Sequence, residues 1–413
     1  MRIRKAIAVP TLGGYYNEDL AAIRNGVEAD GLFYLDPPQS PGFRSIRQPS
    51  EACSILFVLD DQRVVFGDAL CVDYAAAGGR DGIFIAAEQV PLIETICAEL
   101  DDRPIGGFVE MCEELEATVD KRGLHQAAAM FGFSQAILHA VAASRGVTCA
   151  EVIADEFDTN LSRQPIPLGI QSGEHRREAV DKAIMRNVGV LPHGLINNLE
   201  TMGNHGRILL DYVTWIVERL DQHGAPGYQP LIHLDLYGQL GATFDHDLVA
   251  MTKFLCELEQ CAKPFQLCIE TPLLMENAEQ QRARLRSLHA ALQQMESTVR
   301  LIVYEWANNL DEIRSYLVEP VVPIVHVKAP DLGSLHRAVQ AVLECRAASV
   351  SPILGGSCAE TDQSARTVAH VALATAPEWV LARPGMGVDE GVQIMHNEMA
   401  RTIALIEARG EKR

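Results

Sequence analysis

The segment PLIHLDLYG (230–238) is a short apolar run that leads to a charged residue, Asp235. A helical pattern follows over 248–258, with its leucine and methionine side chains on one face. A strand followed by a loop and an amphipathic helix is typical of parallel sheets, whose strands are joined by crossover helices. The same unit recurs between residues 161 and 400, in the runs PIPLGIQSG (165–173), GVLPHGLIN (189–197), PLIHLDLYG (230–238), FQLCIETP (265–272), RLIVYEWA (300–307), IVHVKAPD (324–331), SPILGGSC (351–358) and EWVLARPG (378–385). Eight units close a (β/α) barrel, and polar strand ends favour this barrel over an open, doubly wound sheet.

The residues before this repeat have a different pattern. SILFVLDDQRVVFGDAL (54–70) reads as two strands around a polar turn, which is a hairpin signal. Helical patterns run over 88–100 and 124–144, and the polar, proline-containing stretch 159–167 is the best candidate linker. We therefore expect an α/β protein with an N-terminal α+β capping domain (1–160) and a C-terminal (β/α) TIM-type barrel (161–413).

Composition narrows the class of protein. Of the 413 residues, 48% are hydrophobic and 22% are charged, as in a packed globular protein. The net charge of −20 argues against nucleic acid or an anionic membrane as a partner and leaves a small-molecule substrate. The ten cysteines form no CxxC pair, so reduced thiols are expected rather than a zinc or disulfide motif. Without a signal-peptide pattern or a membrane-spanning apolar run, the sequence predicts a cytoplasmic protein.

Two acidic residues mark the candidate metal site. The active site of such barrels lies at the carboxyl ends of the strands, and Asp235 and Glu270 end two consecutive strands. Two neighbouring carboxylates repel each other, and a hard divalent cation relieves that repulsion. Each residue could instead cap the following helix, but two consecutive strand ends favour a metal, with Mg²⁺ as the expected ion.

Lys328 and His193 are the candidate acid and base. Lys328 ends the apolar run IVHVK, where an ammonium group is costly unless it meets an anion or loses its proton. A lysine of this kind is a plausible general base, and His193 would face it across the mouth as the second acid/base group. The metal would then stabilise the enolate that forms when a proton next to a carboxylate is removed.

The GGSC sequence (355–358) is a further candidate contact for the substrate. Its glycines allow backbone N–H groups to turn toward an anion, and Ser357 adds a hydroxyl group. The alternative is a plain tight turn. Cys358 has no neighbouring base in the sequence, which favours a packing or contact role over a nucleophilic one.

At this point the motifs resemble a known family. The order of strand-end groups resembles the enolase superfamily, and several sequences resemble methylaspartate ammonia-lyases more narrowly. These sequences are AGGRD (77–81), LHQAAAMFGFSQAILHAVA (124–142), QSG (171–173), LPHGLINN (191–198), HLDLYG (233–238), VKAPDLG (327–333), GGSCAET (355–361) and RPGMGVDEG (383–391). The likeness spans nearly the whole chain and implies an enolase-like architecture.

The resemblance also implies a reaction and a set of roles. The reaction is elimination of ammonia from 3-methylaspartate to give mesaconate, by a homodimer that uses Mg²⁺ and is often activated by K⁺. Lys328 and His193 match the acid/base pair, and Asp235 and Glu270 match two of three metal ligands. The remaining matches are substrate contacts: Gln171, Cys358, and Leu381 near the substrate methyl group.

Five positions depart from the family pattern. Tyr304 stands where the family has its third metal-binding aspartate, and Glu305 beside it is the alternative ligand. His326, Asp73 and Ser357 replace two glutamines and a threonine at substrate-contact positions, and Gly169 replaces a phenylalanine. A phenol must ionise before it can bind Mg²⁺ well, so we expect weaker magnesium binding. Ligation by His326 would favour Mn²⁺.

Three functions are therefore considered. The leading one is a metal-dependent carbon–nitrogen lyase acting on methylaspartate or a close analogue. The second keeps the enolate chemistry but changes the outcome, as in the racemases and dehydratases of the superfamily, and Asp73 in place of an amide favours such a change of substrate. The third is a catalytically silent homologue. Retention of both Lys328 and His193 argues against this third function.

Overall fold

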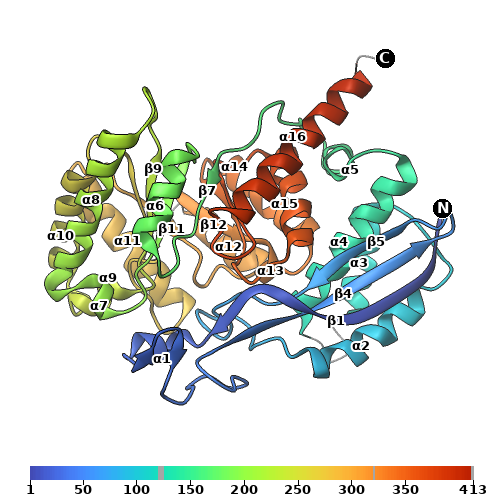
Figure 1. Ribbon diagram of the computed structural model, residues 1–413, viewed down its shortest axis with the longest axis horizontal. Helices are drawn as coiled ribbons and strands as arrows, with labels where there is room; N and C mark the ends of the chain where they lie inside the picture. The colour runs from blue at the N-terminus through green and yellow to red at the C-terminus, as the bar shows by residue number, and fades with distance from the viewer. Residues whose placement is uncertain (120–124, 320, 411–413) are drawn as a thin grey trace.

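A closed barrel of parallel strands forms the C-terminal part of the computed structural model, which describes residues 1–119, 125–319 and 321–410 (Figure 1). Around the barrel the order is β10-β11-β12-β13-β14-β7-β8-β9. The strands are β7 (Leu168–Gly169), β8 (Val190–Leu195), β9 (Leu231–Asp235), β10 (Leu267–Glu270), β11 (Arg300–Val303), β12 (Ile324–Lys328), β13 (Ser351–Gly355) and β14 (Val380–Leu381). Each of the eight apolar runs supplies one strand, so the predicted barrel is confirmed.

Helices surround this barrel. The amphipathic pattern of α8 is typical: Leu209, Val213, Ile216 and Leu220 are all buried against the strands. The longer helices are α6 (Arg176–Met185), α8 (Arg207–His223), α10 (Leu248–Ala262), α11 (Ala278–Gln294), α12 (Leu310–Leu317), α14 (Leu335–Ala347), α15 (Asp362–Thr375) and α16 (Glu390–Gly410). Short turns of helix lie in the loops: α7 (Leu199–Met202), η1 (Asn204–Gly206), α9 (Gln239–Thr243) and α13 (Ala329–Leu332).

The inside of the barrel is packed with side chains rather than open. A buried cluster fills it, made of Val190, Cys268, Ile302, Ile324, Ile353, Trp379 and Leu381. Gly169 makes room for two of these, because a Cβ there would lie 3.0 Å from Leu381 Cδ2 and 3.2 Å from Trp379 Cδ1. A filled interior leaves the polar strand ends as the place where a substrate can bind.

The N-terminal part is built on an antiparallel sheet in the order β5-β4-β1-β6, as Figure 1 shows on its right-hand side. Its strands are β1 (Arg2–Glu18), β4 (Arg47–Leu59), β5 (Val64–Ala69) and β6 (Arg103–Pro104). The predicted hairpin is β4–β5, with Val58 paired to Val64 and Gln62 in the left-handed region of the turn at φ 71°. The other elements are α1 (Leu20–Arg24), β2 (Ala29–Asp30), β3 (Phe33–Tyr34), α2 (Ala86–Leu100), α3 (Phe108–Val119), α4 (Gln126–Arg145) and α5 (Cys149–Glu156).

Helix α4 is the core helix of this part. It is long and apolar enough to cross a membrane by those two criteria alone, but most of it is buried inside the protein. Gly132 on α4 faces β5 so closely that a Cβ at this position would lie 2.6 Å from the Ala69 nitrogen. The helix ends at Gly146, which adopts the left-handed conformation at φ 66° that favours glycine at this position. The sequence pattern over 124–144 predicted this helix, although residues 120–124 lie outside the described residues.

The loop after β5 carries residues of the cap to the mouth of the barrel. The N–H group of Trp306 donates to the Gly78 carbonyl oxygen at 3.1 Å, and Arg80 forms ion pairs with Glu305 and Asp331. The cap therefore packs against the loops that follow β11 and β12. Each of the ten cysteines is a free thiol, as the sequence predicted.

The contact between α4 and β5 gives a first prediction. Replacing Gly132 with alanine should lower the free energy of unfolding by about 1–3 kcal/mol, the usual cost of overpacking a core. The measurement is urea-induced unfolding of the variant beside the parent protein. Gly82→Ala is the matched control, since a Cβ there meets nothing within 4 Å. Equal stability of both variants would show that α4 can move away from β5 at little cost.

Candidate metal and proton-transfer site

Glu270, at the end of β10, is the centre of a buried polar cluster. Its Oε2 accepts a hydrogen bond from His233 Nε2 at 2.6 Å, and its Oε1 accepts one from His326 Nδ1 at 2.5 Å. His193 Nε2 lies 3.2 Å from Oε2. All four side chains are buried, so the carboxylate is surrounded by imidazole groups rather than by water.

The alternation of strand residues explains how this cluster forms. His233 stands two positions before Asp235 on β9, and His326 stands two positions before Lys328 on β12. Residues i and i+2 of a strand face the same side, so each pair is directed into the barrel together. Asp235 and Glu270 are paired directly across β9 and β10, which confirms that the two carboxylates end adjacent strands.

The cluster keeps Glu270 ionised. Burial opposes its charge, but the three imidazole groups outweigh burial and hold the pKa of Glu270 well below its ordinary value. Burial lowers the pKa of His326 to about 4 and also lowers the pKa of His233, so both donate as neutral rings. For His193, burial disfavours the cation, yet the hydrogen-bonding and charge of Glu270 raise its pKa.

Asp235 is the second carboxylate of the site. Its Oδ1 accepts the Tyr237 N–H group at 3.2 Å, while its buried Oδ2 has no hydrogen-bond partner among the described residues. His193 Nε2 lies 3.8 Å from Oδ2. Burial and the nearby charge of Glu270 raise the pKa of Asp235, because two buried negative charges disfavour each other. A cation between them would remove that cost.

Tyr304, which follows β11, lies between the cluster and the lysine. Lys328 Nζ is 3.6 Å from the centre of the Tyr304 ring, and His326 packs edge-on against the same ring at 5.5 Å. Burial and the charge of Asp235 raise the pKa of Tyr304 well above its ordinary value. The phenol is therefore neutral, and its Oη has no hydrogen-bond partner within the described part of the chain.

Glu305 points away from this cluster. Its carboxylate pairs with Arg80 of the cap at 2.7 Å, and Arg80 also binds Asp331 at 2.7 Å. All three side chains are nearly fully buried. Glu305 was the alternative third metal ligand in the sequence-based prediction, and the structure instead directs it to a guanidinium group. The reason is strand alternation, which turns neighbouring residues to opposite sides.

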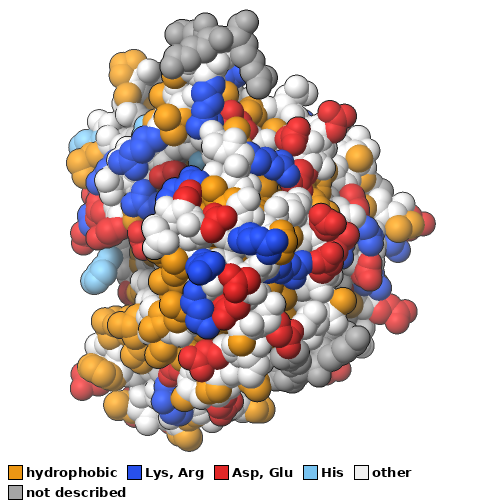
Figure 2. Space-filling view, turned by 90° about the vertical axis from the view of Figure 1, so that its right-hand side faces the viewer, with side chains coloured by type: hydrophobic (Ala, Val, Ile, Leu, Met, Phe, Trp, Pro, Cys, Tyr) orange, Lys and Arg blue, Asp and Glu red, His pale blue; other side chains and the backbone are white. Residues whose placement is uncertain are grey.

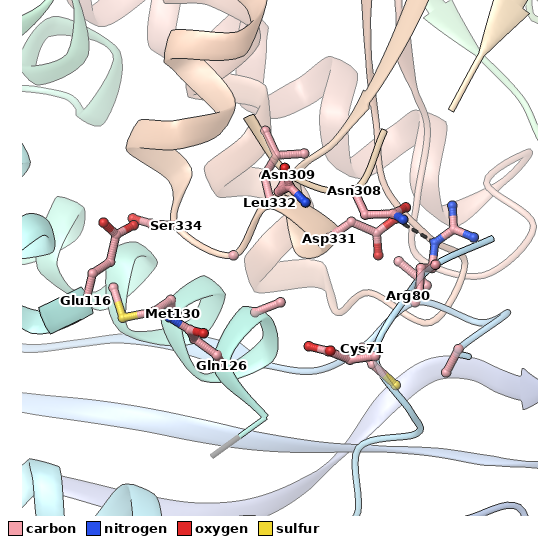
Figure 3. A pocket seen from close by; sticks show the side chains of 16 residues that line it. Cys71, Arg80, Glu116, Gln126, Met130, Asn308, Asn309, Asp331, Leu332 and Ser334 are labelled. Atoms are coloured by element: carbon pink, nitrogen blue, oxygen red, sulfur yellow. Dashed lines mark hydrogen bonds and ion pairs between the residues drawn. The ribbon is translucent and has the colours of Figure 1, made fainter. Parts of the chain in front are cut away.

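A cavity of about 320 Å³ opens beside this ion-pair network. Figure 3 shows Asp331 and Arg80 joined at one side of it, with Glu116, Gln126 and Ser334 at the other. The cavity lies between the cap and the barrel, and neither Lys328 nor Glu270 lines it. We therefore place the chemistry in the buried cluster rather than in this cavity.

The GGSC loop is tied down by internal contacts. The Asp73 N–H donates to Ser357 Oγ at 2.8 Å, and the Ser357 hydroxyl donates to Asp73 Oδ1 at 3.1 Å. The Ser357 N–H donates to Glu360 Oε2 at 2.8 Å, and Glu360 pairs with the buried Arg383 at 2.8 Å. One backbone N–H group of this loop, that of Ser357, is thus occupied by Glu360. Burial and Asp73 raise the pKa of the Cys358 thiol, which disfavours its nucleophilic form.

The two remaining residues predicted to contact the substrate, Gln171 and Leu381, lie in different surroundings. Gln171 follows β7 and is half-buried, with its Oε1 unpartnered among the residues described. Leu381 belongs to the cluster that fills the barrel. Sequence reasoning missed His233 as a member of the site and Arg80 as the partner of Glu305. Only the spacing of His233 from Asp235 could have indicated the first of these.

Strained backbone marks the same strand ends. Three non-glycine residues here adopt left-handed conformations: His193 at φ 45°, Tyr237 at φ 46° and Thr271 at φ 42°. Such conformations are costly for residues with a Cβ and cluster at functional sites, where the surrounding structure holds them. The strain supports a functional role for the mouth of the barrel.

Comparison with known proteins identifies the family. The family models for the N-terminus and C-terminus of methylaspartate ammonia-lyase match residues 1–158 and 160–408. The chain belongs to the methylaspartate ammonia-lyase family. It is 39% identical to the methylaspartate ammonia-lyase of Clostridium tetanomorphum, covering 99% of this chain and 100% of that one. It is 38% identical to the methylaspartate ammonia-lyase of Citrobacter amalonaticus, and the match covers 99% of this chain and 100% of that one.

Solved structures of methylaspartate ammonia-lyases agree with the fold. The magnesium complex of β-methylaspartase from C. tetanomorphum has a TM-score of 0.91 at 39% identity, over 99% of this chain and all of that one. The C. amalonaticus enzyme containing (2S,3S)-3-methylaspartic acid has a TM-score of 0.93 at 38% identity, over 98% of this chain and 100% of that one. A muconate lactonizing enzyme from Pseudomonas fluorescens shares the fold at 14% identity and a TM-score of 0.63, over 92% of this chain and 87% of that one. The predicted enolase-like architecture is therefore confirmed.

The packing of His326 gives a second prediction, specific to this ammonia-lyase family member. A Cβ on Gly355 would overlap the His326 ring, so Gly355→Ala should displace that ring from Glu270 and lower the melting temperature by several degrees. His326→Ala alone should also destabilise the protein. The double variant, which carries both Gly355→Ala and His326→Ala, should lose less stability than the two single variants lose together. The reason is that the clash needs both the new Cβ and the His326 ring. Strict additivity in thermal unfolding would contradict this packing.

Proposed function

We propose that this chain is a metal-dependent carbon–nitrogen lyase that eliminates ammonia from 3-methylaspartate, or from a close amino-dicarboxylate analogue, to give mesaconate or its counterpart. The observation that carries the proposal is that Lys328 and the paired carboxylates Asp235 and Glu270 are all buried at strand ends of the barrel, where the charge of Lys328 acts to lower the pKa of Asp235. Membership of the family and the substrate named for the C. amalonaticus structure support it.

The residues present fit a divalent cation. Asp235 Oδ2 is buried and unpartnered among the described residues, Glu270 is ionised, and the two carboxylates end adjacent strands. When bound, such an ion supplies the positive charge that stabilises an enolate formed from a substrate carboxylate. Tyr304 is neutral where the family pattern has an aspartate, so the match to magnesium alone is incomplete.

Lys328 is the proposed base. It is only 8% exposed, and the face of Tyr304 at 3.6 Å fixes the position of its Nζ. In the proposed reaction Nζ accepts the proton from the carbon next to the substrate carboxylate. The electrons of that C–H bond form the carbon–carbon double bond, the C–N bond breaks, and ammonia leaves. The burial of Lys328 keeps bulk water away from the negative charge that develops on the substrate.

The substrate contacts are proposed from the same region. Asp73 carries a carboxylate that suits a substrate ammonium group, and Ser357 orients it through the hydrogen bond at 3.1 Å. Gln171, Cys358 and Leu381 remain proposed contacts by their family positions. His326 is held by Glu270 and would reach a substrate only indirectly. His193 as the acid/base group on the opposite face stays a prediction.

We also propose that the chain forms a homodimer. The outer face of the cap sheet carries exposed apolar side chains: Ile7, Val9 and Leu12 on β1, and Val64 and Phe66 on β5. Figure 2 shows hydrophobic side chains gathered at the lower left of that side of the molecule, beside a surface of mixed charge. A second copy of the chain could cover such a face.

Five further expectations belong to this proposal. The protein would act in the cytoplasm in amino-acid degradation, and K⁺ would activate it. Mn²⁺ would replace Mg²⁺ if imidazole groups bind the ion. We place the boundary between cap and barrel at residues 160 and 161.

Removing the base gives a third prediction. Lys328→Ala should lower turnover by roughly a hundredfold or more, the usual scale of a lost general base. The measurement is ammonia release from 3-methylaspartate, with deuterium exchange from solvent into recovered substrate as a second readout. His193→Ala, assayed alongside, tests the predicted partner. Lys253→Ala, which changes an exposed lysine on α10, should leave both readouts unchanged. A Lys328 variant with parental exchange would remove this residue from the reaction.

Tyr304 gives a fourth prediction. Tyr304→Asp places a third carboxylate beside Asp235 and should tighten Mg²⁺ binding and raise ammonia release, because Mg²⁺ prefers charged oxygen ligands. Magnesium affinity is measured by calorimetry, and ammonia release from 3-methylaspartate is measured in the same samples. Tyr304→Phe is the control, since it removes only a neutral hydroxyl group. A gain in magnesium affinity without any ammonia release would argue for a different substrate.

A further inference from the structure

We infer that Arg80 of the cap is a positioning residue for the proposed base, because it binds the loop that carries Lys328 and the loop that carries Tyr304 at the same time. The inference deepens the proposed function and rests on it, since it concerns the residue assigned to proton abstraction. Its first test, however, reads the position of Lys328 and needs no turnover.

The amino group of Lys328 has no polar partner that fixes it. Among the described residues, no hydrogen bond or ion pair reaches its Nζ, which instead lies 3.6 Å from the centre of the Tyr304 ring. A lysine amino group stands on a flexible four-carbon chain. Its position at the barrel mouth therefore depends on how the backbone at Lys328 and the backbone at Tyr304 are held relative to each other.

Arg80 joins these two pieces of backbone. Its Nε lies 2.7 Å from Asp331 Oδ2, as Figure 3 shows, and its Nη1 lies 2.7 Å from Glu305 Oε2. Asp331 belongs to α13, the short helical turn whose N-cap residue is Lys328. Glu305 directly follows Tyr304. One planar guanidinium group thus anchors both loops, and its rigid fork fixes the spacing between them.

No second cation shares this task within the described ranges. There, Arg80 is the only group that forms an ion pair with Glu305 or with Asp331. The three side chains are at most 8% exposed, so water is a poor substitute for the lost partner. Removing the fork would therefore release both loops at once.

The loop that carries Arg80 is itself held close to the barrel. Gly78 and Gly79 both adopt the left-handed conformation, at φ 58° and φ 85°. A Cβ on Gly78 would lie 1.7 Å from Glu305 Oε2, and a Cβ on Gly79 would lie 2.7 Å from the Trp306 ring. The two glycines permit this close approach, which brings the arginine within reach of both carboxylates.

Arg80 also contacts Tyr304 directly, with its guanidinium carbon 4.9 Å from the centre of the ring. The arginine therefore touches the residue against which Lys328 lies, as well as the two loops. Because the ion pairs act on the loops rather than on the ring, the same arrangement would hold an aspartate at position 304 close to Lys328.

The first measurement reads the geometry by nuclear magnetic resonance. Lysine labelled with ¹³C at the ε carbon is incorporated into the full chain, and Lys328→Arg assigns the Lys328 signal by its loss. Because the end of this side chain lies over an aromatic ring, the ring current should shift its signal upfield, and Tyr304→Phe should keep that shift. In Arg80→Lys the shift should be lost, because one ammonium group cannot span both carboxylates.

The second measurement is turnover of 3-methylaspartate. Arg80→Lys should lower kcat and the rate of deuterium exchange roughly tenfold to a hundredfold, the scale of a misplacement of about 1 Å. KM should stay near the parental value, because Arg80 is not a proposed substrate contact. A merely structural role would lower the melting temperature without changing kcat.

Two further variants sharpen the comparison. Asp331→Asn releases only the loop of Lys328 and should reproduce both effects, while adding little to Arg80→Lys in the double variant. Arg337→Lys is the matched control, because it makes the same change in another ion pair between cap and barrel, 2.9 Å from Glu116. It should leave the Lys328 signal and the exchange rate unchanged. Melting temperatures confirm that each variant is folded.

Two results would overturn the inference. One is a Lys328 signal without an upfield shift in the parent protein, or with the same shift in both Arg80→Lys and Asp331→Asn. The other is a displaced Lys328 signal together with parental deuterium exchange. Failure of the proposed function looks different: the parent itself would release no ammonia from 3-methylaspartate, while the Lys328 signal would still move in Arg80→Lys.

Discussion

A buried, ionised carboxylate, Glu270, is the interaction on which the site depends. Burying a charge is costly unless polar partners replace the lost water, and three imidazole groups from β8, β9 and β12 perform that task. These strands flank β10 within one unbroken run of the barrel, β8-β9-β10-β11-β12, so the cluster depends on the strands pairing in this order. The chemistry of the site and the order of the strands are therefore linked through one side chain.

The barrel could be predicted from sequence because its signal is local. Each strand is an apolar run of a few residues with a helix pattern after it, as in the segments that became β9 and β10. The pairing of Asp235 with Glu270 followed from the same pattern, since consecutive strands are neighbours in a (β/α) barrel. The hairpin in the cap was equally local, with its polar turn between two apolar strands.

The rest of the site depends on contacts between distant residues. His233 lies inside an apolar run, and its spacing from Asp235 is the one sequence signal that its ring faces the same side as Asp235. Arg80 and Glu305 meet only because the cap folds over the barrel, which turned an expected metal ligand into one half of an ion pair. The GGSC loop looked free to bind an anion, but Glu360, itself paired with Arg383, accepts the Ser357 N–H from within the fold.

The Arg80 network has a consequence for how the two parts of the molecule relate. Glu305 and Asp331 belong to the barrel, and their shared counter-charge belongs to the cap. Without that arginine, two buried carboxylates would lose their common cation, a far greater loss than that of an exposed ion pair. The barrel is thus electrostatically incomplete by itself. Cap and barrel are therefore coupled through this ion-pair network, and any other cap would have to supply a cation at the same position.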